Sequence, residues 1–436
     1  MKKLLILLSA AVLALGFAAC EQLPKLATIT IQLKADGAAF SQAGVTVTVL
    51  SNTGTKFESL TNESGVASFT LPMGSYSASA TYKTAAAGVR VVYSGSIPSV
   101  VAAVDGTTSY TIDLNRVENQ QIIIKELYNT GCPKDGGNAY FDDAYVILYN
   151  NSDLEADASD IVFSFVAPYN ANGTNKYYVD GNLLYENENW IPAYGAIWWF
   201  TSPVKIPAYS QIVVAIFGAI DHTATVPASV NLANSGYYWM SNSDVAAYTN
   251  KKYAVADMIP AANYLTTVPI SQGNAWALSN SAPGFYIGRM SNAEAKALCE
   301  NTDAYDHTMG TSAAFNVAKF PKANVVDAIE VWSAANQDKS QLRFTSDINT
   351  GMIPITNKMG YSVYRNVDKE ATEALEENAG KLVYNYAGGT ADVEGSTDPS
   401  GIDAEASMAN GAHIIYCDTN SSMMDFHQRK VASLKK

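Results

Sequence analysis

The chain has 436 residues and a formal net charge of −13 at pH 7, with only 16% of its residues charged. An acidic chain whose one basic run is its last few residues is a poor ligand for nucleic acid or anionic lipid headgroups. Its length predicts two or three domains, and its 26 tyrosines and low charge content are typical of β-rich proteins outside the cytoplasm.

The N-terminus predicts a targeting segment. Lys2 and Lys3 precede an apolar run, Leu4 to Leu15, which is too short to span a bilayer and ends in "FAAC". This pattern resembles a bacterial lipobox, so residues 1–19 are predicted to be a lipoprotein signal peptide. Cys20 would carry the lipid, and residues 20–25 would form a tether. Removing two lysines and no acid changes the net charge from −13 to −15. The predicted location is the outer membrane, on a face that the sequence leaves open.

Residues 26–116 are predicted to form a small β-sandwich. "ATITIQL" and "GVTVTVL" alternate apolar and polar residues, which is the pattern of half-buried strands. Asn62-Glu63-Ser64-Gly65 indicates a turn between such strands. The strand that ends in Leu-Pro, the following Gly and Tyr76 resemble a carboxypeptidase-regulatory-like domain. The resemblance implies a spacer or docking module.

Residues 117–436 are predicted to form a larger, β-sandwich-like domain with few short helices. Ser291 and Glu294 form the pattern of a capping box, and Asp368 to Gly380 reads as a helix with an N-cap and a glycine stop. The fold class is therefore mostly β. Strands are predicted at "QIIIKELY", "AYVILY", "DIVFSFV", "GAIWWF", "SQIVVAIF", "GFYIGRM", "DAIEVW" and "HIIYC".

The adjacent acids Asp142 and Asp143 raise the question of a metal site or a catalytic pair. In an extended segment neighbouring side chains point apart, whereas acid–base catalysis needs two carboxyls converging on a substrate. A calcium site would need six to eight oxygen ligands, and Asp135 and Asn138 could join it. The spacing is not that of an EF-hand, so we interpret these carboxylates as solvated, structural acids at the rim of a strand.

The histidines give one weak candidate for a metal ligand, His307, which Asp303 and Asp306 flank. A hydrogen-bonded structural role is predicted for each histidine. His413 and Cys417 in "HIIYC" are too far apart along a strand, at roughly 13 Å, to hold one zinc ion. The three cysteines after Cys20 lack CxxC spacing; one disulfide is conceivable, but buried thiols are favoured. The cysteines are Cys132, Cys299 and Cys417.

The remaining functional signal is aromatic. Neighbouring aromatic residues on a strand face opposite sides, so one of them could form an exposed platform for a sugar, a haem or a protein partner. Core packing is the alternative for most of them, and "GYYWMSNSD" reads as a surface loop. The candidates for a ligand or partner surface are Trp190, Trp198, Trp199, Tyr237, Tyr238 and Trp239.

Motifs of known enzyme classes are absent: there is no GxSxG, HExxH, Walker-type loop or GxGxxG. Absence of a motif lowers the odds of catalysis, although a dispersed active site would leave no such trace. We therefore predict a protein that is not an enzyme.

"IIIKELYNTGCP" followed by "DDAYVILYNNSD" resembles the start of a lamin-tail-like β-domain. More closely, residues 117–436 resemble domain-of-unknown-function family 4876 of Bacteroidetes lipoproteins, through "YSQIVVAIFGAIDHT", "YRNVDKEATEALEENAGKLVYNY" and "DTNSSMMDF". The resemblance implies an accessory role beside a TonB-dependent receptor in nutrient capture. Where relatives often carry an acid, this chain has Ile147. Glycan binding and iron or haem binding are the alternatives, and calcium is not ruled out.

Overall fold

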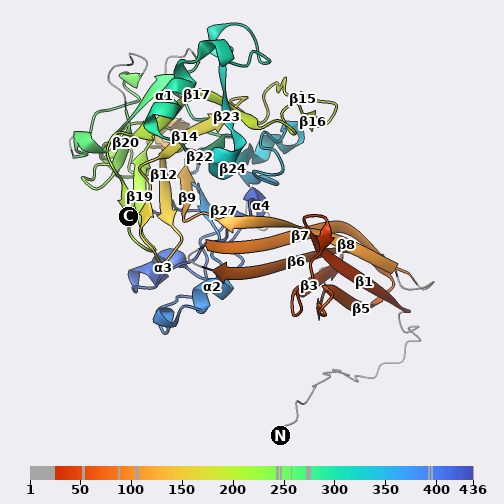
Figure 1. Cartoon of the computed structure of the whole chain (residues 1–436). Coiled ribbons are helices and arrows are strands. Elements are labelled where there is room, and N and C mark those ends of the chain that lie inside the picture. Colours follow the sequence, from red (N-terminus) through yellow and green to blue (C-terminus); the bar gives the residue numbers. More distant parts are fainter. Residues whose placement is uncertain are drawn as a thin grey trace. The chain divides into compact units, whose positions relative to one another are not determined.

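The structure of the chain is a computed structural model. It describes residues 25–51, 55–86, 89–103, 108–241, 245, 248–256, 258–271, 276–390, 393 and 396–435. The chain divides into two compact units (Figure 1). One comprises residues up to Lys83 with Tyr93–Arg116, and the other comprises Thr84–Val92 with Val117–Lys436. Among the described residues, no helix is long and apolar enough to cross a membrane. The predicted signal peptide and Cys20 lie outside the described residues.

The first unit is built from strands that bury every second residue. Ile29, Ile31 and Leu33 of β1 are fully buried and share one core with residues of β3, β5 and β8. The sheet order is β2-β1-β8-β7-β6-β3-β4, with β5 also paired to β1. The predicted alternation is therefore confirmed. The strands are β1 (Leu26–Ala35), β2 (Ala38–Ala39), β3 (Thr46–Ser51), β4 (Lys56–Leu60), β5 (Val66–Pro72), β6 (Gly74–Ala86), β7 (Val89–Ala102) and β8 (Thr108–Asn119).

The turn predicted at residues 62–65 is confirmed. The Asn62 side chain accepts hydrogen bonds from the backbone N–H groups of Ser64 and Val66, each at 3.0 Å. Gly65 has φ +74°, and a Cβ there would lie 1.9 Å from the Phe40 carbonyl oxygen. Only glycine fits this position, because both the backbone conformation and the space exclude a side chain.

The second unit is organised around one sheet of 13 strands. Its order is β25-β24-β22-β14-β17-β21-β20-β19-β12-β9-β26-β27, and β23 also pairs with β17. The strands are β9 (Ile122–Tyr128), β12 (Tyr145–Asn150), β14 (Ile161–Val166), β17 (Trp190–Phe200), β19 (Gln211–Ala215), β20 (Tyr238–Met240), β21 (Tyr264–Pro269), β22 (Gly284–Arg289), β23 (Val317–Pro321), β24 (Val325–Ser333), β25 (Ile353–Ile355), β26 (Ser362–Arg365) and β27 (Phe426–Arg429).

Shorter elements connect these strands. The two-stranded ladders are β10 (Cys132–Lys134) with β11 (Asn138–Tyr140), β13 (Ala156–Asp157) with β18 (Lys205–Ile206), and β15 (Tyr178–Val179) with β16 (Asn182–Leu183). The α-helices are α1 (Asn292–Glu300), α2 (Lys369–Glu373), α3 (Ala404–Ala409) and α4 (Ser422–Asp425). Single 3-10 turns are η1 (Asp135–Gly137), η2 (His222–Ala224), η4 (Ala261–Asn263), η5 (Thr302–Ala304), η6 (Ala313–Phe315), η7 (Lys322–Asn324), η8 (Ala334–Lys339) and η9 (Glu376–Asn378). The mostly β fold class is confirmed.

The large sheet has a hydrophobic core on each face. Successive residues of β14 alternate between the two cores: Phe163 and Phe165 belong to one, Val162 and Val166 to the other. The helix α1 packs on β17, β21 and β23 and contributes Cys299 to the second core. Strands in this sheet therefore bury both faces, and their sequences read as continuous apolar runs.

The sheet also folds over on itself. Its distant strands β24 and β9 touch, and the backbone N–H of Ile124 in β9 donates to Asp327 Oδ2 in β24 at 2.6 Å. The terminal strands β25 and β27 are joined because the Gln428 side chain accepts a hydrogen bond from the Thr356 N–H. The two terminal strands of the sheet therefore lie against each other, which limits access to edges that could pair with another molecule.

The predicted helices are confirmed in part. At α1 the Ser291 and Glu294 side chains satisfy each other's backbone amides, which is the predicted capping box. Asp368 caps α2 as predicted, but this helix ends at Glu373 instead of continuing to Gly380. The Asn378 side chain donates to the carbonyls of Thr372 and His413, at 2.8 and 2.7 Å. These tertiary hydrogen bonds hold Glu376–Asn378 as the separate turn η9 instead of a continuation of α2.

Residues 413–417, "HIIYC", form no strand, and that prediction is wrong. Tyr416 makes a single antiparallel bridge with Val367, but the backbone partners are mainly side chains. Asn378 Oδ1 accepts from His413 N, Thr372 Oγ1 accepts from Ile415 N, and Asn151 Oδ1 accepts from Tyr416 N. Side-chain oxygens here replace the neighbouring strand of a sheet, and the apolar pattern of the sequence cannot reveal that.

The segment after β27 closes over the first strand of the unit. Ser433 N donates to Glu126 Oε1 at 3.0 Å, and Ser433 Oγ donates to Glu126 Oε2. Glu126 lies in β9 and is fully buried. A buried carboxylate is costly unless it is hydrogen-bonded, so Ser433 stabilises it from a position 307 residues away along the chain.

Candidate functional site

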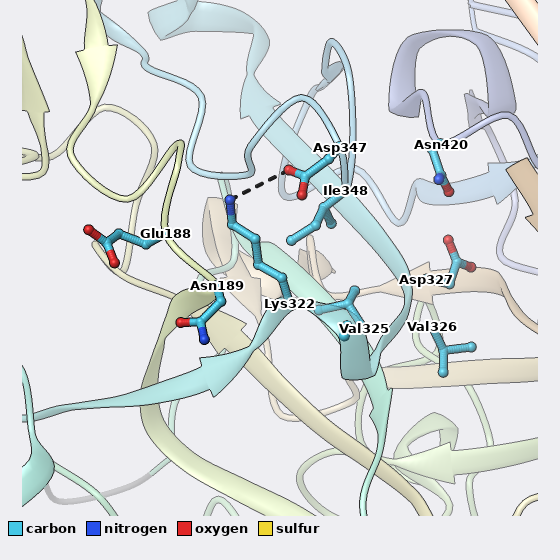
Figure 2. Close-up of a pocket in the computed structure, with 10 residues that line it drawn as sticks. Glu188, Asn189, Lys322, Val325, Val326, Asp327, Asp347, Ile348 and Asn420 are labelled. Atoms are coloured by element: carbon cyan, nitrogen blue, oxygen red, sulfur yellow. Dashed lines mark ion pairs between the residues drawn. The ribbon is translucent and has the colours of Figure 1, made fainter. Parts of the chain in front are cut away.

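A polar cavity of about 490 Å³ lies in the second unit. Its walls come from segments that are far apart in sequence: the residues just before β17, η7 with the start of β24, the loop around residue 347, and the loop before α4 (Figure 2). The lining residues are Glu188, Asn189, Lys322, Ala323, Val325, Val326, Asp327, Asp347, Ile348 and Asn420.

Three polar side chains of the lining form no hydrogen bond or ion pair with the rest of the described chain. The Glu188 carboxylate and the carboxamides of Asn189 and Asn420 have neither a hydrogen bond nor an ion pair to any described residue, although the backbone carbonyls of Asn189 and Asn420 accept hydrogen bonds. These groups can therefore exchange water for a ligand without breaking a bond within the fold.

Lys322 extends between the two sides of the cavity (Figure 2). Its ammonium donates to the Glu186 carbonyl oxygen at 2.6 Å and lies 3.7 Å from Asp347 Oδ1. The Lys322 side chain is 9% exposed, whereas that of Asp347 is 60% exposed. The ion pair is loose, and its Asp347 carboxylate is open to water, so this charge remains accessible to a ligand.

The inner end of the cavity rests on a buried charge network. Asp327 there accepts hydrogen bonds from Ile124 N and from the Arg365 guanidinium. Arg365 also lies 3.6 Å from Asp418 and 3.7 Å from Asp425. Burial lowers the pKa of Arg365, but the three carboxylates outweigh burial and raise it. Arg365 therefore stays charged, and it locks β26 against β24 beneath the cavity.

The aromatic residues predicted to form a surface are mostly in the core. Trp198, Trp199 and Trp239 are at most 5% exposed. Trp198 packs against Tyr248 and Trp276, and the Trp239 indole donates to the Phe217 carbonyl oxygen. The prediction of an exposed platform is wrong for these three. For Trp198 and Trp199 the premise was that one face of the strand meets water, whereas both faces of β17 meet a core. Trp239 lies in β20 and belongs to the first of these cores.

The other three predicted aromatic residues are half-buried. Tyr237 and Tyr238 pack on the edge of the first core of the sheet, and Tyr238 begins β20 instead of lying in a loop. Trp190 follows Glu188 and Asn189 directly and contacts Tyr177 and Tyr185, while the Lys319 ammonium lies 4.9 Å from its ring centroid. Trp190 therefore supports the wall that carries Asn189 and does not form an open platform.

The adjacent acids Asp142 and Asp143 diverge, as predicted, but only one of them is solvated. Asp142 is half-exposed and lies 3.7 Å from the Lys252 ammonium. Asp143 is fully buried and accepts hydrogen bonds from Ser229 Oγ at 2.5 Å and Tyr128 Oη at 3.2 Å. Burial raises the pKa of the Asp143 carboxyl. The interpretation of both as solvated rim acids is thus corrected for Asp143, which anchors the core.

The predicted metal candidates do not converge. Asp303 and His307 are exposed, while Asp306 accepts hydrogen bonds from Tyr177 Oη at 2.6 Å and Thr308 N at 2.9 Å. No group of three or more His, Cys, Asp and Glu side chains within the described part of the chain is placed to hold a metal ion.

The other titratable candidates are engaged in the fold. His222 bonds Tyr140 Oη and the Gly218 carbonyl, and His427 bonds Tyr386 Oη and Asn366. Within the described chain, Cys132, Cys299 and Cys417 form no disulfide with one another; Cys132 and Cys299 are buried and Cys417 is half-buried. Burial raises the pKa of the Cys132 and Cys299 thiols to about 12.

The cavity residues were missed by sequence reasoning. Glu188, Asn189, Lys322, Asp347 and Asn420 belong to polar loops without a motif, and the lining residues of any two of the segments that meet here are at least 20 positions apart. The one local signal is that Glu188 and Asn189 directly precede the aromatic strand β17, so their backbone lies at the end of the sheet.

Fold and cavity together define a β-sandwich-like protein with a polar pocket in its larger unit. Residues 209–400 match the family described as "Protein of unknown function (DUF4876)", which confirms the predicted resemblance to this family. A DUF4876 family protein from Bacteroides thetaiotaomicron has a similar solved structure, with a TM-score of 0.53 and 17% identity over 93% of this chain and 96% of that chain. At this identity the likeness shows a shared fold.

A DUF3823 family protein from Parabacteroides merdae also matches, with 10% identity over 70% of this chain and 98% of that chain. Its TM-score of 0.17 is too low to support a common fold. No curated protein has a sequence match to this chain.

Proposed function

We propose that the protein is a lipid-anchored binding protein of the cell envelope that takes up a small polar ligand in the cavity lined by Glu188, Asn189, Lys322, Asp347 and Asn420. The observation that carries the proposal is the group of three polar side chains in this cavity without a partner in the described chain. Glu188 and Asn189 are exposed and Asn420 is half-buried, so a ligand that enters the cavity can reach all three groups. A few converging polar groups in a concave site are what fixes the orientation of a ligand.

Binding is favoured over catalysis by the state of the reactive groups. His222 and His427 are buried and bonded through both ring nitrogens, and Cys132, Ser229 and Asp143 hydrogen-bond one another or their neighbours inside the core. Groups fixed in this way cannot reach a substrate. The cavity itself offers charge and hydrogen bonds, which orient and hold a molecule.

The proposed anchor is Cys20, and the proposed partner is a TonB-dependent outer-membrane receptor. Support comes from the lipobox-like "FAAC" and from the resemblance to a family of Bacteroidetes lipoproteins. In this arrangement the bilayer holds the protein beside the receptor, and the cavity delivers a nutrient to it.

The first experiment is co-purification of the tagged, full-length protein from its native outer membrane in mild detergent. Wild type is compared with Cys20→Ala and with the cavity variant Glu188→Gln/Asn420→Ala. We expect a TonB-dependent receptor in stoichiometric amount with wild type and the cavity variant, and its loss with Cys20→Ala. Recovery of wild type without acyl chains in the soluble periplasm would contradict the proposal.

The ligand role is tested on the same preparations. The receptor's cargo is titrated against wild type and the cavity variant by calorimetry. Binding to wild type that weakens at least tenfold in the variant is the expected result. Equal binding by the two proteins would place the ligand elsewhere and remove the cavity from the proposal.

A further inference from the structure

A second cavity, of about 320 Å³, is formed by one short stretch of the second unit. It comprises the end of α2, the turn η9 and the loop that follows. All its lining residues fall between Glu373 and Tyr384: Glu373, Leu375, Glu376, Asn378, Ala379, Gly380, Leu382 and Tyr384. The stretch shares no lining residue with the cavity proposed above.

One wall of this second cavity is an exposed aromatic ring. Tyr384 is 46% exposed, although large aromatic side chains are usually well buried. Its position is fixed, because its hydroxyl donates to Glu373 Oε1 at 2.9 Å and its backbone forms a bridge with Ile402. The ring is therefore held in place with much of its surface in contact with water.

The remaining walls combine carboxylates and aliphatic side chains. Glu373 and Glu376 are exposed, and the Glu376 carboxylate has no partner among the described residues. Leu375 and Leu382 are half-buried. An aromatic ring, an unpaired carboxylate and apolar walls are the groups that recognise an organic ammonium ion, since the ring face and the carboxylate attract its charge and the walls contact its carbons.

The ammonium group of Lys369 already lies near this ring and one of these carboxylates. The Lys369 ammonium lies 6.0 Å from the Tyr384 ring centroid and 4.0 Å from Glu373 Oε1. The Lys369 side chain is 53% exposed and is held only by this weak pair. An ammonium group is thus attracted by the ring and the carboxylate together, which is the arrangement a ligand would use.

We infer that the cavity between Glu373 and Tyr384 binds an organic ammonium group, carried either by a free amine or by a lysine side chain of a peptide. Tyr384 contributes the ring face, Glu376 and Glu373 contribute charge, and Leu375 and Leu382 contact the carbon skeleton. The inference is independent of the ligand and partner proposed for the larger cavity.

The test uses ligand-observed NMR with the folded full chain. Choline is titrated beside its uncharged carbon isostere, dimethylbutanol, and Nα-acetyl-lysine methylamide represents a peptide source. We expect choline or the lysine amide to bind and dimethylbutanol not to bind, because shape is nearly the same and only the charge differs. Binding of the lysine amide alone would identify a peptide as the source.

Three variants locate the binding. Tyr384→Leu keeps an apolar side chain but removes the ring, and Glu376→Gln removes the unpaired charge at constant volume. Each should weaken binding roughly two- to fivefold. Lys369→Gln should strengthen binding by a similar factor, because it removes the internal ammonium that competes for the same groups.

The matched control is Lys296→Gln, since Lys296 and Glu300 also form an exposed pair four residues apart on a helix, at 3.8 Å. It should leave binding unchanged. A gain in affinity cannot come from misfolding, so Lys369→Gln remains informative if the other variants are unstable. Equal binding of choline and dimethylbutanol, absence of binding by both charged probes, or indifference to all three variants would overturn the inference.

Discussion

Two charged regions of the second unit differ in how completely their groups are bonded. Arg365 is fully buried, and its guanidinium reaches Asp327 and the carbonyls of Ile124 and Cys417, with Asp418 and Asp425 nearby. Lys322 is paired with an exposed carboxylate at 3.7 Å, and the side-chain amides of Asn189 and Asn420 have no hydrogen-bond partner among the described residues. In the first region the polar groups are bonded to one another within the fold. In the second region several polar groups are left to bind water or a ligand. Removing a charge from the first region should therefore mainly lower stability, whereas removing a charge from the second should mainly change ligand binding.

The largest effect on stability is expected for Arg365→Met. The variant leaves Asp327, Asp418 and Asp425 buried without a counter-ion, and the free energy of unfolding should fall by about 3–5 kcal/mol. Urea denaturation measures this change. Arg289→Met is the matched control, because Arg289 pairs with Asp160 at the surface and should cost less than about 1 kcal/mol. Equal losses would show that burial of the network does not matter.

The next largest effect on stability tests whether the buried Glu126 carboxylate depends on the hydrogen bonds that it accepts from Ser433. Ser433→Ala removes one of the two hydrogen bonds that Ser433 donates to Glu126, and should lower the free energy of unfolding by about 1.5–3 kcal/mol. Ser346→Ala is its control, since Ser346 makes the same type of bond to Glu186 in an exposed position, at 2.8 Å. A loss below about 0.5 kcal/mol at Ser433 would contradict the prediction.

A third prediction uses pH. Burial, with a smaller contribution from Arg429, lowers the pKa of His427 from 6.5 to about 3. The unfolded chain takes up this proton near pH 6.5 and the folded chain only near pH 3, so protonation favours unfolding between these values. Stability should decrease by about 1.4 kcal/mol per pH unit below pH 6.5 from this group alone.

The measurement for His427 is urea denaturation of wild type and His427→Gln at pH 7, 6 and 5. The difference between the two proteins should shrink as pH falls, because the variant has no imidazole to protonate. A difference that stays constant over this range would mean that His427 is not the group responsible.

The smallest effect on stability is expected for a variant in the second region, at the cavity. Asp347→Asn breaks the exposed pair with Lys322, and the free energy of unfolding should change by less than about 1 kcal/mol. Thermal unfolding measures stability, and titration with the receptor's cargo measures binding. Binding should change more than stability. A stability loss as large as that of Arg365→Met would place Lys322 and Asp347 among the structural charges.

Much of the fold could be predicted from local patterns. Alternation identified β1 and β3, continuous apolar runs identified β9, β12 and β14, and the capping box at Ser291 identified α1. These features depend on neighbours in sequence. The failures depend on distant groups: Asn151, Thr372 and Asn378 hold residues 413–417 in place of a strand, and a second core covers the outer face of Trp199.

The cavity could not be predicted for the same reason. Glu188, Lys322, Asp347 and Asn420 come from four loops, and their meeting depends on how β17, β24 and α4 are arranged. The burial of Asp143 could not be predicted either. Its sequence neighbourhood suggests a solvated acid, but Ser229 and Tyr128, which bury and bond it, are 86 and 15 residues away.

The bond between Ser433 and Glu126 also bears on how the chain is made. β9 is the first strand of the large sheet to be synthesised, yet it pairs with β26 as well as with β12, and among the described residues its buried Glu126 carboxylate accepts hydrogen bonds from Ser433, 307 residues later. Contacts of such long separation form slowly, because a large loop must close first. Glu126 can therefore form its native hydrogen bonds with Ser433 only once residue 433 has been synthesised, long after β9 itself.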